Sequence, residues 1–127
     1  MFYEYDQNNS GGSFELTENL GKHVWIEADS QELANYRAVQ IGIYFDGVEK
    51  GYDCECCGDR WYEPWGSRHG AETLAELVEP HREFQKRWPA RWDGNRIGVV
   101  HYKDGRRANV WYDDDTWDAH EVKELEA

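Results

Sequence analysis

Short runs of alternating or consecutive apolar residues recur along this chain, and they predict the strands of a sheet. Such runs are rich in β-branched and aromatic residues and end at clusters of Gly, Asn, Asp or Ser. The clearest pair lies within residues 96–112, because Asp104 and Gly105 form a strong tight-turn signal between two β-rich halves. Further strands are expected at residues 1–7, 13–17, 22–28 and 43–47.

Helical spacing of apolar residues appears in the remaining segments. Residues 29–42 predict a helix, with Asp29 or Ser30 as the N-cap and with Ala34 and Ala38 on its apolar face. Residues 71–78 and 80–88 predict two further helical segments, the second beginning at Pro80.

These elements define an α+β fold class. We expect an antiparallel sheet with one main helix packed on it, a zinc-knuckle loop and a C-terminal β-hairpin. The 127 residues fit one domain over 1–112, followed by an acidic C-terminal tail over 113–127.

All three cysteines lie within four positions, in an otherwise irregular stretch from residue 52 to residue 70. Cys54 and Cys57 have the spacing of a zinc knuckle, and the glycine that follows allows the tight turn that such a site needs. Cys56 is either a third ligand or a spare thiol. We expect Cys54, Cys57, His69 and one of Cys56 or His81 to bind Zn²⁺, with a second subunit as another source of ligands. The alternative is a cluster of reduced cysteines that act as small apolar side chains.

The expected role of the zinc ion is structural. No spacing of His and Glu in the chain places a carboxylate base beside a metal with an open position. A metal ion would instead order the irregular stretch, because its binding free energy adds to the free energy of folding. No phosphate loop or nucleophile motif occurs either, so nothing specific supports an enzyme.

Net charge excludes some partners. The charge of −12 repels nucleic acids and anionic membranes, and direct binding to nucleic acid is disfavoured. No apolar run is long enough for a membrane span, so we expect a cytoplasmic protein with reduced thiols. Residues 80–107 nevertheless contain eight basic and three acidic side chains. This basic segment either pairs with the acidic remainder of the molecule or forms a local anion site.

Aromatic residues are abundant, with seven Trp, eight Tyr and four Phe. A Trp ring that stacks on a base, beside an arginine that binds a phosphate, would hold a nucleotide. The alternative is core packing, with arginines stacked on the rings. The candidate ligand-binding residues are Trp61, Trp65, Arg87, Trp88, Arg91 and Trp92.

Three segments together resemble a family of small uncharacterised proteins of tailed bacteriophages. They are MFYEYDQNNSGGSF at the start, VWIEADSQELANYRAVQIGIYFDG after it, and DCECCGDRW at the cysteines. The resemblance covers about residues 1–65 and implies a phage accessory protein that acts in the cytoplasm of the bacterial host. It carries no catalytic residues over to this chain.

The expected function is therefore non-enzymatic binding of a host component. The favoured form is counter-defence, either by sequestering a nucleotide-like signal or by docking on a defence protein. One alternative is an acidic DNA mimic that occupies a host nucleic-acid-binding protein. The other alternative is an enzyme of unknown reaction. Assembly of the chain into a homo-oligomer is compatible with the sequence.

Overall fold

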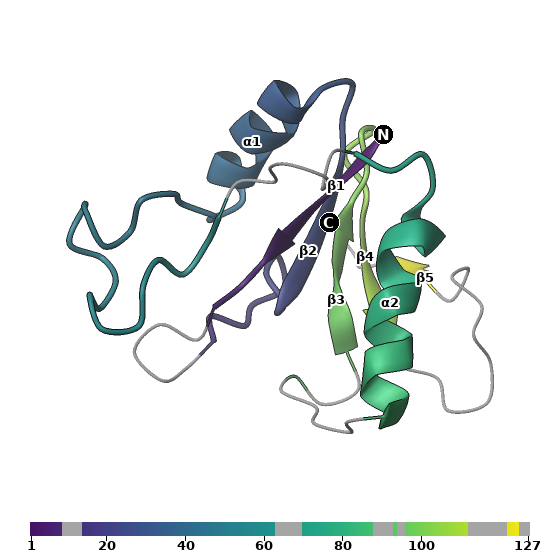
Figure 1. The fold of residues 1–127 in the computed structure, drawn as a ribbon. Helices are drawn as coiled ribbons and strands as arrows, with labels where there is room; N and C mark the ends of the chain where they lie inside the picture. Colours follow the sequence, from purple (N-terminus) through teal and green to yellow (C-terminus); the bar gives the residue numbers. More distant parts are fainter. Residues whose placement is uncertain (9–13, 63–69, 88–92, 94–95, 112–121, 125–127) are drawn as a thin grey trace.

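The computed structural model describes residues 1–8, 14–62, 70–87, 93, 96–111 and 122–124 (Figure 1). Within them the chain forms five strands and two helices. In chain order these are β1 (Phe2–Asp6), β2 (His23–Glu27), α1 (Gln31–Gln40), α2 (Leu74–Arg87), β3 (Arg96–His101), β4 (Arg107–Trp111) and β5 (Val122–Glu124).

The strands form one sheet in the order β1-β2-β3-β4-β5, which confirms the α+β class. The sheet is mixed and not purely antiparallel, because β2 and β3 run parallel while the other three neighbouring pairs are antiparallel. Parallel neighbours need a long crossover connection. Here that connection contains both helices, and it returns β3 to the sheet beside β2.

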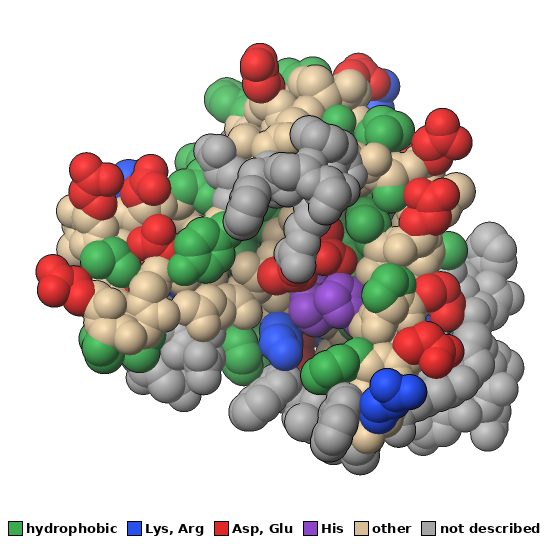
Figure 2. Space-filling view, viewed as in Figure 1, with side chains coloured by type: hydrophobic (Ala, Val, Ile, Leu, Met, Phe, Trp, Pro, Cys, Tyr) green, Lys and Arg blue, Asp and Glu red, His purple; other side chains and the backbone are tan. Residues whose placement is uncertain are grey.

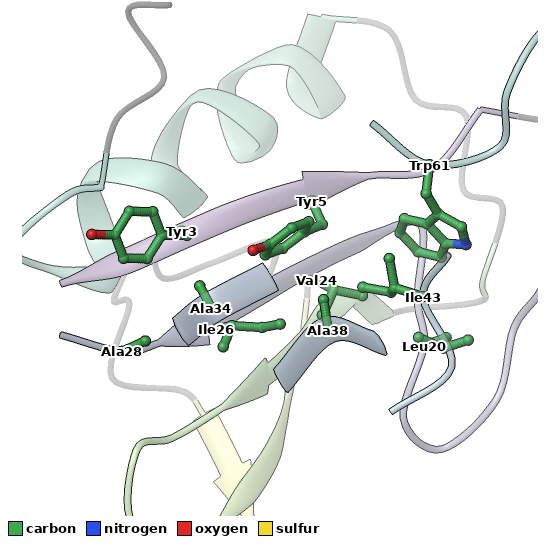
Figure 3. Packing of buried hydrophobic residues seen from close by; sticks show 10 residues of the cluster. All are labelled: Tyr3, Tyr5, Leu20, Val24, Ile26, Ala28, Ala34, Ala38, Ile43 and Trp61. Carbon is green, nitrogen blue, oxygen red and sulfur yellow. The ribbon is translucent and has the colours of Figure 1, made fainter. Parts of the chain in front are cut away.

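Successive side chains of β1 and β2 point to opposite faces of the sheet, and each face carries its own hydrophobic cluster. On one face the sheet packs against α1, whose Ala34 and Ala38 are fully buried (Figure 3). The Tyr5 hydroxyl donates a hydrogen bond to Asn35 Oδ1 at 2.6 Å, so its polar atom is satisfied beside this core. Ser30 caps α1, because its hydroxyl accepts the backbone N–H of Leu33.

The opposite face packs against α2, which supplies Leu74 and Val78 to the second cluster. The two helical segments expected here form one continuous helix that contains Pro80. A proline lacks the N–H that would bond one turn back, yet the helix continues through Pro80, and Leu74 and Val78 before it are packed in the second cluster. Neither of the described helices is long and apolar enough to cross a membrane.

The hairpin of β3 and β4 is confirmed. Its connection places Gly105 at a φ of +94°, which a residue with a Cβ rarely adopts, and the Gly105 N–H donates to the Tyr102 carbonyl at 3.0 Å. In the segment expected as an acidic tail, residues 122–124 form β5 and pair with β4.

Two expected strands are absent from the described residues. The structure describes residues 14–17 and 43–47, and neither segment is a strand. Near residue 15, a side chain forms the hydrogen bonds that a neighbouring strand would otherwise form. The Gln7 amide oxygen accepts the Glu15 N–H, and Gln7 Nε2 donates to the Glu15 carbonyl at 3.1 Å. In the second segment, Ile43 is buried in the cluster under α1.

Candidate functional site

The three cysteines form an exposed tight turn. The backbone N–H groups of Cys57 and Gly58 both donate to the Cys54 carbonyl, at 3.2 and 3.1 Å. Gly58 has a φ of +83°, so the glycine after the second cysteine has the conformational role that the sequence predicts. The three sulfur atoms lie within 4.8 Å of one another, and Cys56 Sγ lies 3.6 Å from Cys57 Sγ. The turn can therefore gather three thiolates around one metal ion.

Hydrogen bonds between the thiols give Cys54 and Cys56 different pKa values. A hydrogen bond from Cys56 lowers the pKa of Cys54, and backbone N–H groups of the turn act in the same direction. The pKa of Cys56 is raised to about 11 by its hydrogen bonds to Cys54 and Cys57 and by their charge. Cys54 is thus the thiol that ionises more readily than Cys56. Metal ligation requires thiolates, and a bound cation would remove the repulsion between them.

The structure brings the three cysteines of the predicted ligand set together. Cys56 lies with Cys54 and Cys57, within reach of the same ion, so it could serve as a third ligand. His81 lies elsewhere, because α2 carries it to the face of the sheet where Asp6 and His23 lie. His69 falls outside the described residues, so the fourth zinc ligand stays a prediction.

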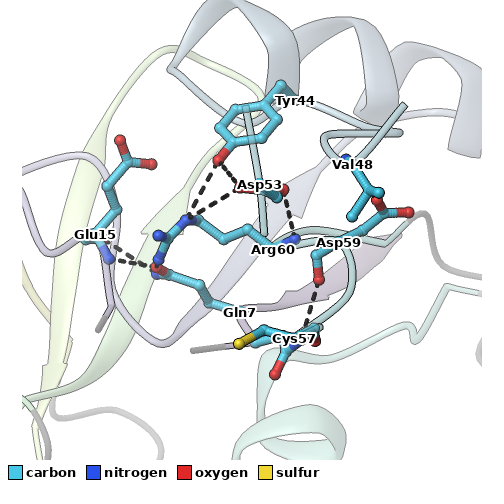
Figure 4. A network of polar contacts seen from close by, with 9 residues as sticks. Gln7, Glu15, Tyr44, Val48, Asp53, Cys57, Asp59 and Arg60 are labelled. Atoms are coloured by element: carbon cyan, nitrogen blue, oxygen red, sulfur yellow. Dashed lines mark hydrogen bonds and ion pairs between the residues drawn. The ribbon is translucent and has the colours of Figure 1, made fainter. Parts of the chain in front are cut away.

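A buried ion pair anchors the loop that carries the cysteines (Figure 4). The side chain of Asp53 is only 1% exposed, and it accepts hydrogen bonds from the Arg60 backbone N–H at 2.8 Å and from the Tyr44 hydroxyl at 2.7 Å. The Arg60 guanidinium reaches Gln7 Oε1 at 2.9 Å and the Tyr44 oxygen at 3.3 Å. Gly47 leaves room for this arrangement, because a Cβ there would lie 1.9 Å from an Asp53 oxygen.

Further hydrogen bonds tie the same loop to the end of β1 and close it on itself. Asn8 Nδ2 donates to the carbonyl of Cys57 at 2.7 Å, and the Asn8 N–H donates to the Arg60 carbonyl at 2.8 Å. Asp59 accepts the Val48 N–H at 2.9 Å. Residues 47–60 are therefore held by protein groups. A metal ion would order the cysteine turn, and the rest of this loop has its own support.

A second cluster of side chains that could hold a metal ion lies between the sheet and α2, and it was not expected from the sequence. Asp6 and His23 are direct cross-strand partners, as are Glu4 and Trp25. His23 Nδ1 donates to Asp6 Oδ1 at 2.6 Å, and His81 Nε2 donates to Glu4 Oε1 at 2.8 Å. The two imidazole rings stack with centroids 3.7 Å apart.

Burial and the paired charges set the ionisation of this cluster. Burial acts to raise the pKa of Asp6, but the hydrogen bond and charge of His23 outweigh it and lower that pKa to about 2. Burial lowers the pKa of His23, and the hydrogen bond to Asp6 offsets this only in part. Near neutral pH, Asp6 is therefore a carboxylate beside a largely neutral His23. Ionised carboxylate and neutral imidazole are the forms that bind metals.

The candidate nucleotide-binding residues are not gathered into one site by the described part of the chain. Trp61 is 1% exposed and belongs to the core under α1, which favours the core-packing alternative for this ring. Arg87 is exposed at the end of α2. The other four candidates lie outside the described residues: Trp65, Trp88, Arg91 and Trp92.

Cations of the basic segment are largely paired with acids. Arg96 binds Asp93 at 2.5 Å and also donates to the Thr17 and Leu20 carbonyls at 2.8 and 3.0 Å. Further ion pairs among the described residues include Arg82–Glu79, Lys103–Asp29, Arg106–Asp104 and Arg107–Glu18. These pairs support the interpretation of the segment as a neutralised surface, and they weaken the case for an anion site.

The fold and the two clusters thus define a small α+β protein with two groups of side chains that could hold a metal ion. The chain belongs to a family described as a domain of unknown function, DUF7296, whose match covers residues 1–118. No curated protein matches the chain, and no solved structure matches it.

Proposed function

We propose that this protein is a non-enzymatic phage accessory protein that binds Zn²⁺ through Cys54, Cys56 and Cys57. The observation that carries the metal proposal is the exposed turn with three sulfur atoms within 4.8 Å. Three thiolates leave one tetrahedral position, which His69 fills in the predicted ligand set. A filled site of this kind is structural and would fix the shape of the turn.

The metal-bound turn would then present a rigid surface to a host protein. Tyr52 and Tyr62 are exposed near it, and the Tyr62 hydroxyl would lie 3.1 Å from a Cβ placed on Gly58. Exposed tyrosines are enriched at interfaces because the ring buries apolar area while the hydroxyl forms hydrogen bonds. Docking on a host defence protein is favoured over nucleotide sequestration, since Trp61 is buried and the described cations are mostly paired.

Two measurements test this function separately. Metal analysis of the purified protein should give at least about one zinc ion per chain, and this content should fall by about one ion per chain when Cys54 and Cys57 are replaced by serine. Expression in bacteria that carry individual defence systems, followed by phage challenge, should show rescue of phage growth in at least one. The Tyr62→Ser variant should keep its zinc but lose the rescue. Rescue by none of the systems would rule out the counter-defence role.

The acidic surface supports a second candidate, a DNA mimic. The net charge is −12, and acidic side chains are spread over the face shown in Figure 2. Because the described basic segment is paired with acids, it adds little positive potential to oppose them. A mimic would be released from its partner as salt rises from about 0.1 M to about 1 M, where the Debye length falls to about 3 Å. Retention at high salt would instead indicate docking through apolar and aromatic contacts.

A further inference from the structure

The cluster between the sheet and α2 consists of carboxylate and imidazole side chains, which are uncommon in a helix–sheet interface. Alternate residues of β1 and β2 on this face include Phe2 and Trp25, which are buried in the second hydrophobic cluster. At the next positions on the same face stand Glu4, Asp6 and His23, and α2 adds His81 from above. A partly buried charge is costly unless it is paired or coordinates a metal.

Two carboxylates in one small site strengthen this point. The side chains of Asp6 and Glu4 are 29% and 12% exposed, and both carboxyl groups lie beside the stacked imidazoles of His23 and His81. One ligand atom from each of Asp6, His23 and His81 lies within 4.8 Å of the other two.

Solvent can reach the donor set. His81 is 22% exposed at its side chain, and Figure 2 shows histidine surface at the exterior with acidic side chains beside it. An ion could therefore enter without unfolding the helix–sheet interface. The outer groups are ordered as well, because Trp25 Nε1 donates to Glu4 Oε1 at 2.9 Å while the same oxygen accepts from His81. Carboxylates that orient ligating histidines, held by further hydrogen bonds, are typical of metal sites.

We propose that Asp6, His23 and His81 form a binding site for a divalent first-row transition-metal ion, with Glu4 at the edge of the donor set. Two imidazole nitrogens with carboxylate oxygens suit ions such as Zn²⁺, Fe²⁺ and Co²⁺ and are poorly matched to Ca²⁺ or Mg²⁺. This site is independent of the cysteine turn, and its existence does not rest on the proposed function.

The test uses a full-length variant in which all three cysteines are replaced by serine, so that only the second site can respond. Titration with Zn²⁺ in a calorimeter should show about one ion bound per chain, while Mg²⁺ at the same concentration gives no heat of binding. Adding His81→Gln to this variant should weaken zinc binding by at least about tenfold. His101→Gln is the matched control, because His101 is bonded to the Asn19 carbonyl and lies outside the cluster.

NMR spectroscopy of the histidine rings tests the same site without a substitution at His23 or His81, in case such a variant fails to fold. In the variant that lacks only the cysteines, nitrogen resonances of the His23 and His81 rings should shift when Zn²⁺ is added, and those of His101 should not. Unchanged His23 and His81 resonances at excess zinc would overturn the proposal. It would equally be overturned if zinc binding to the cysteine-free chain survived the His81→Gln substitution undiminished.

Discussion

His101 gives the most quantitative prediction, since its protonation opposes folding. Its side chain is buried in β3, 2% of the residue is exposed, and Nε2 donates to the Asn19 carbonyl at 2.8 Å. Burial lowers the pKa of His101 to about 4, and the nearby charges of Arg37 and Arg107 act in the same direction, although the bond to Asn19 opposes them. The unfolded chain has an ordinary histidine pKa of 6.5.

The sign of the effect follows from these two values. Between them the unfolded state binds the proton and the folded state does not, so stability is full above pH 6.5 and is lost as the pH falls toward 4. The complete loss corresponds to about 3 kcal/mol, of which about 2 kcal/mol falls between about pH 7 and about pH 5.

Urea unfolding followed by tryptophan fluorescence would measure this loss. His101→Gln is the informative variant, because the glutamine amide can still donate to the Asn19 carbonyl but does not titrate. Relative to this variant, the wild-type protein should lose about 2 kcal/mol on acidification from about pH 7 to about pH 5. His23 and the carboxylates titrate in both proteins and cancel in the comparison. Unfolding free energies that change in parallel with pH in the two proteins would show that protonation of His101 does not destabilise the folded state.

Two further predictions concern the loop that carries the cysteines. Arg60→Met should lower the unfolding free energy by about 3 kcal/mol, because it leaves the buried Asp53 carboxylate without its cation, and adding Asp53→Asn should recover part of the loss in the same denaturation assay. Gly58→Ala should cost about 1 kcal/mol and weaken zinc binding, because a φ of +83° strains any residue with a Cβ. An alanine variant with unchanged melting temperature and zinc affinity would show that the turn does not need this backbone conformation.

Local signals explain what the sequence could predict. Asp104 and Gly105 specify their own turn, and Ser30 caps α1 through a hydroxyl three residues from its partner N–H. The cysteine turn is equally local, since four neighbouring residues and a glycine determine it. These features depend on contacts between residues close in sequence, so their residue types suffice to predict them.

Features that depend on distant contacts could not be predicted in this way. The parallel pairing of β2 with β3 joins residues 75 positions apart, as in His23 and Gly98, and leaves no periodic signal in either strand. Asp6, His23 and His81 lie in three different elements, and only the strand register and the position of α2 bring them together. One sequence signal was available, because charged and imidazole side chains interrupt the apolar positions of β1 and β2 on a single face.

X-ray absorption at the zinc edge of the purified protein would show whether zinc is bound at the cysteine turn. Sulfur ligands are expected at about 2.3 Å from the zinc ion. This sulfur contribution should disappear when Cys54 and Cys57 are replaced by serine. A protein without zinc, or a zinc spectrum with nitrogen and oxygen neighbours and no sulfur, would contradict zinc binding at this turn.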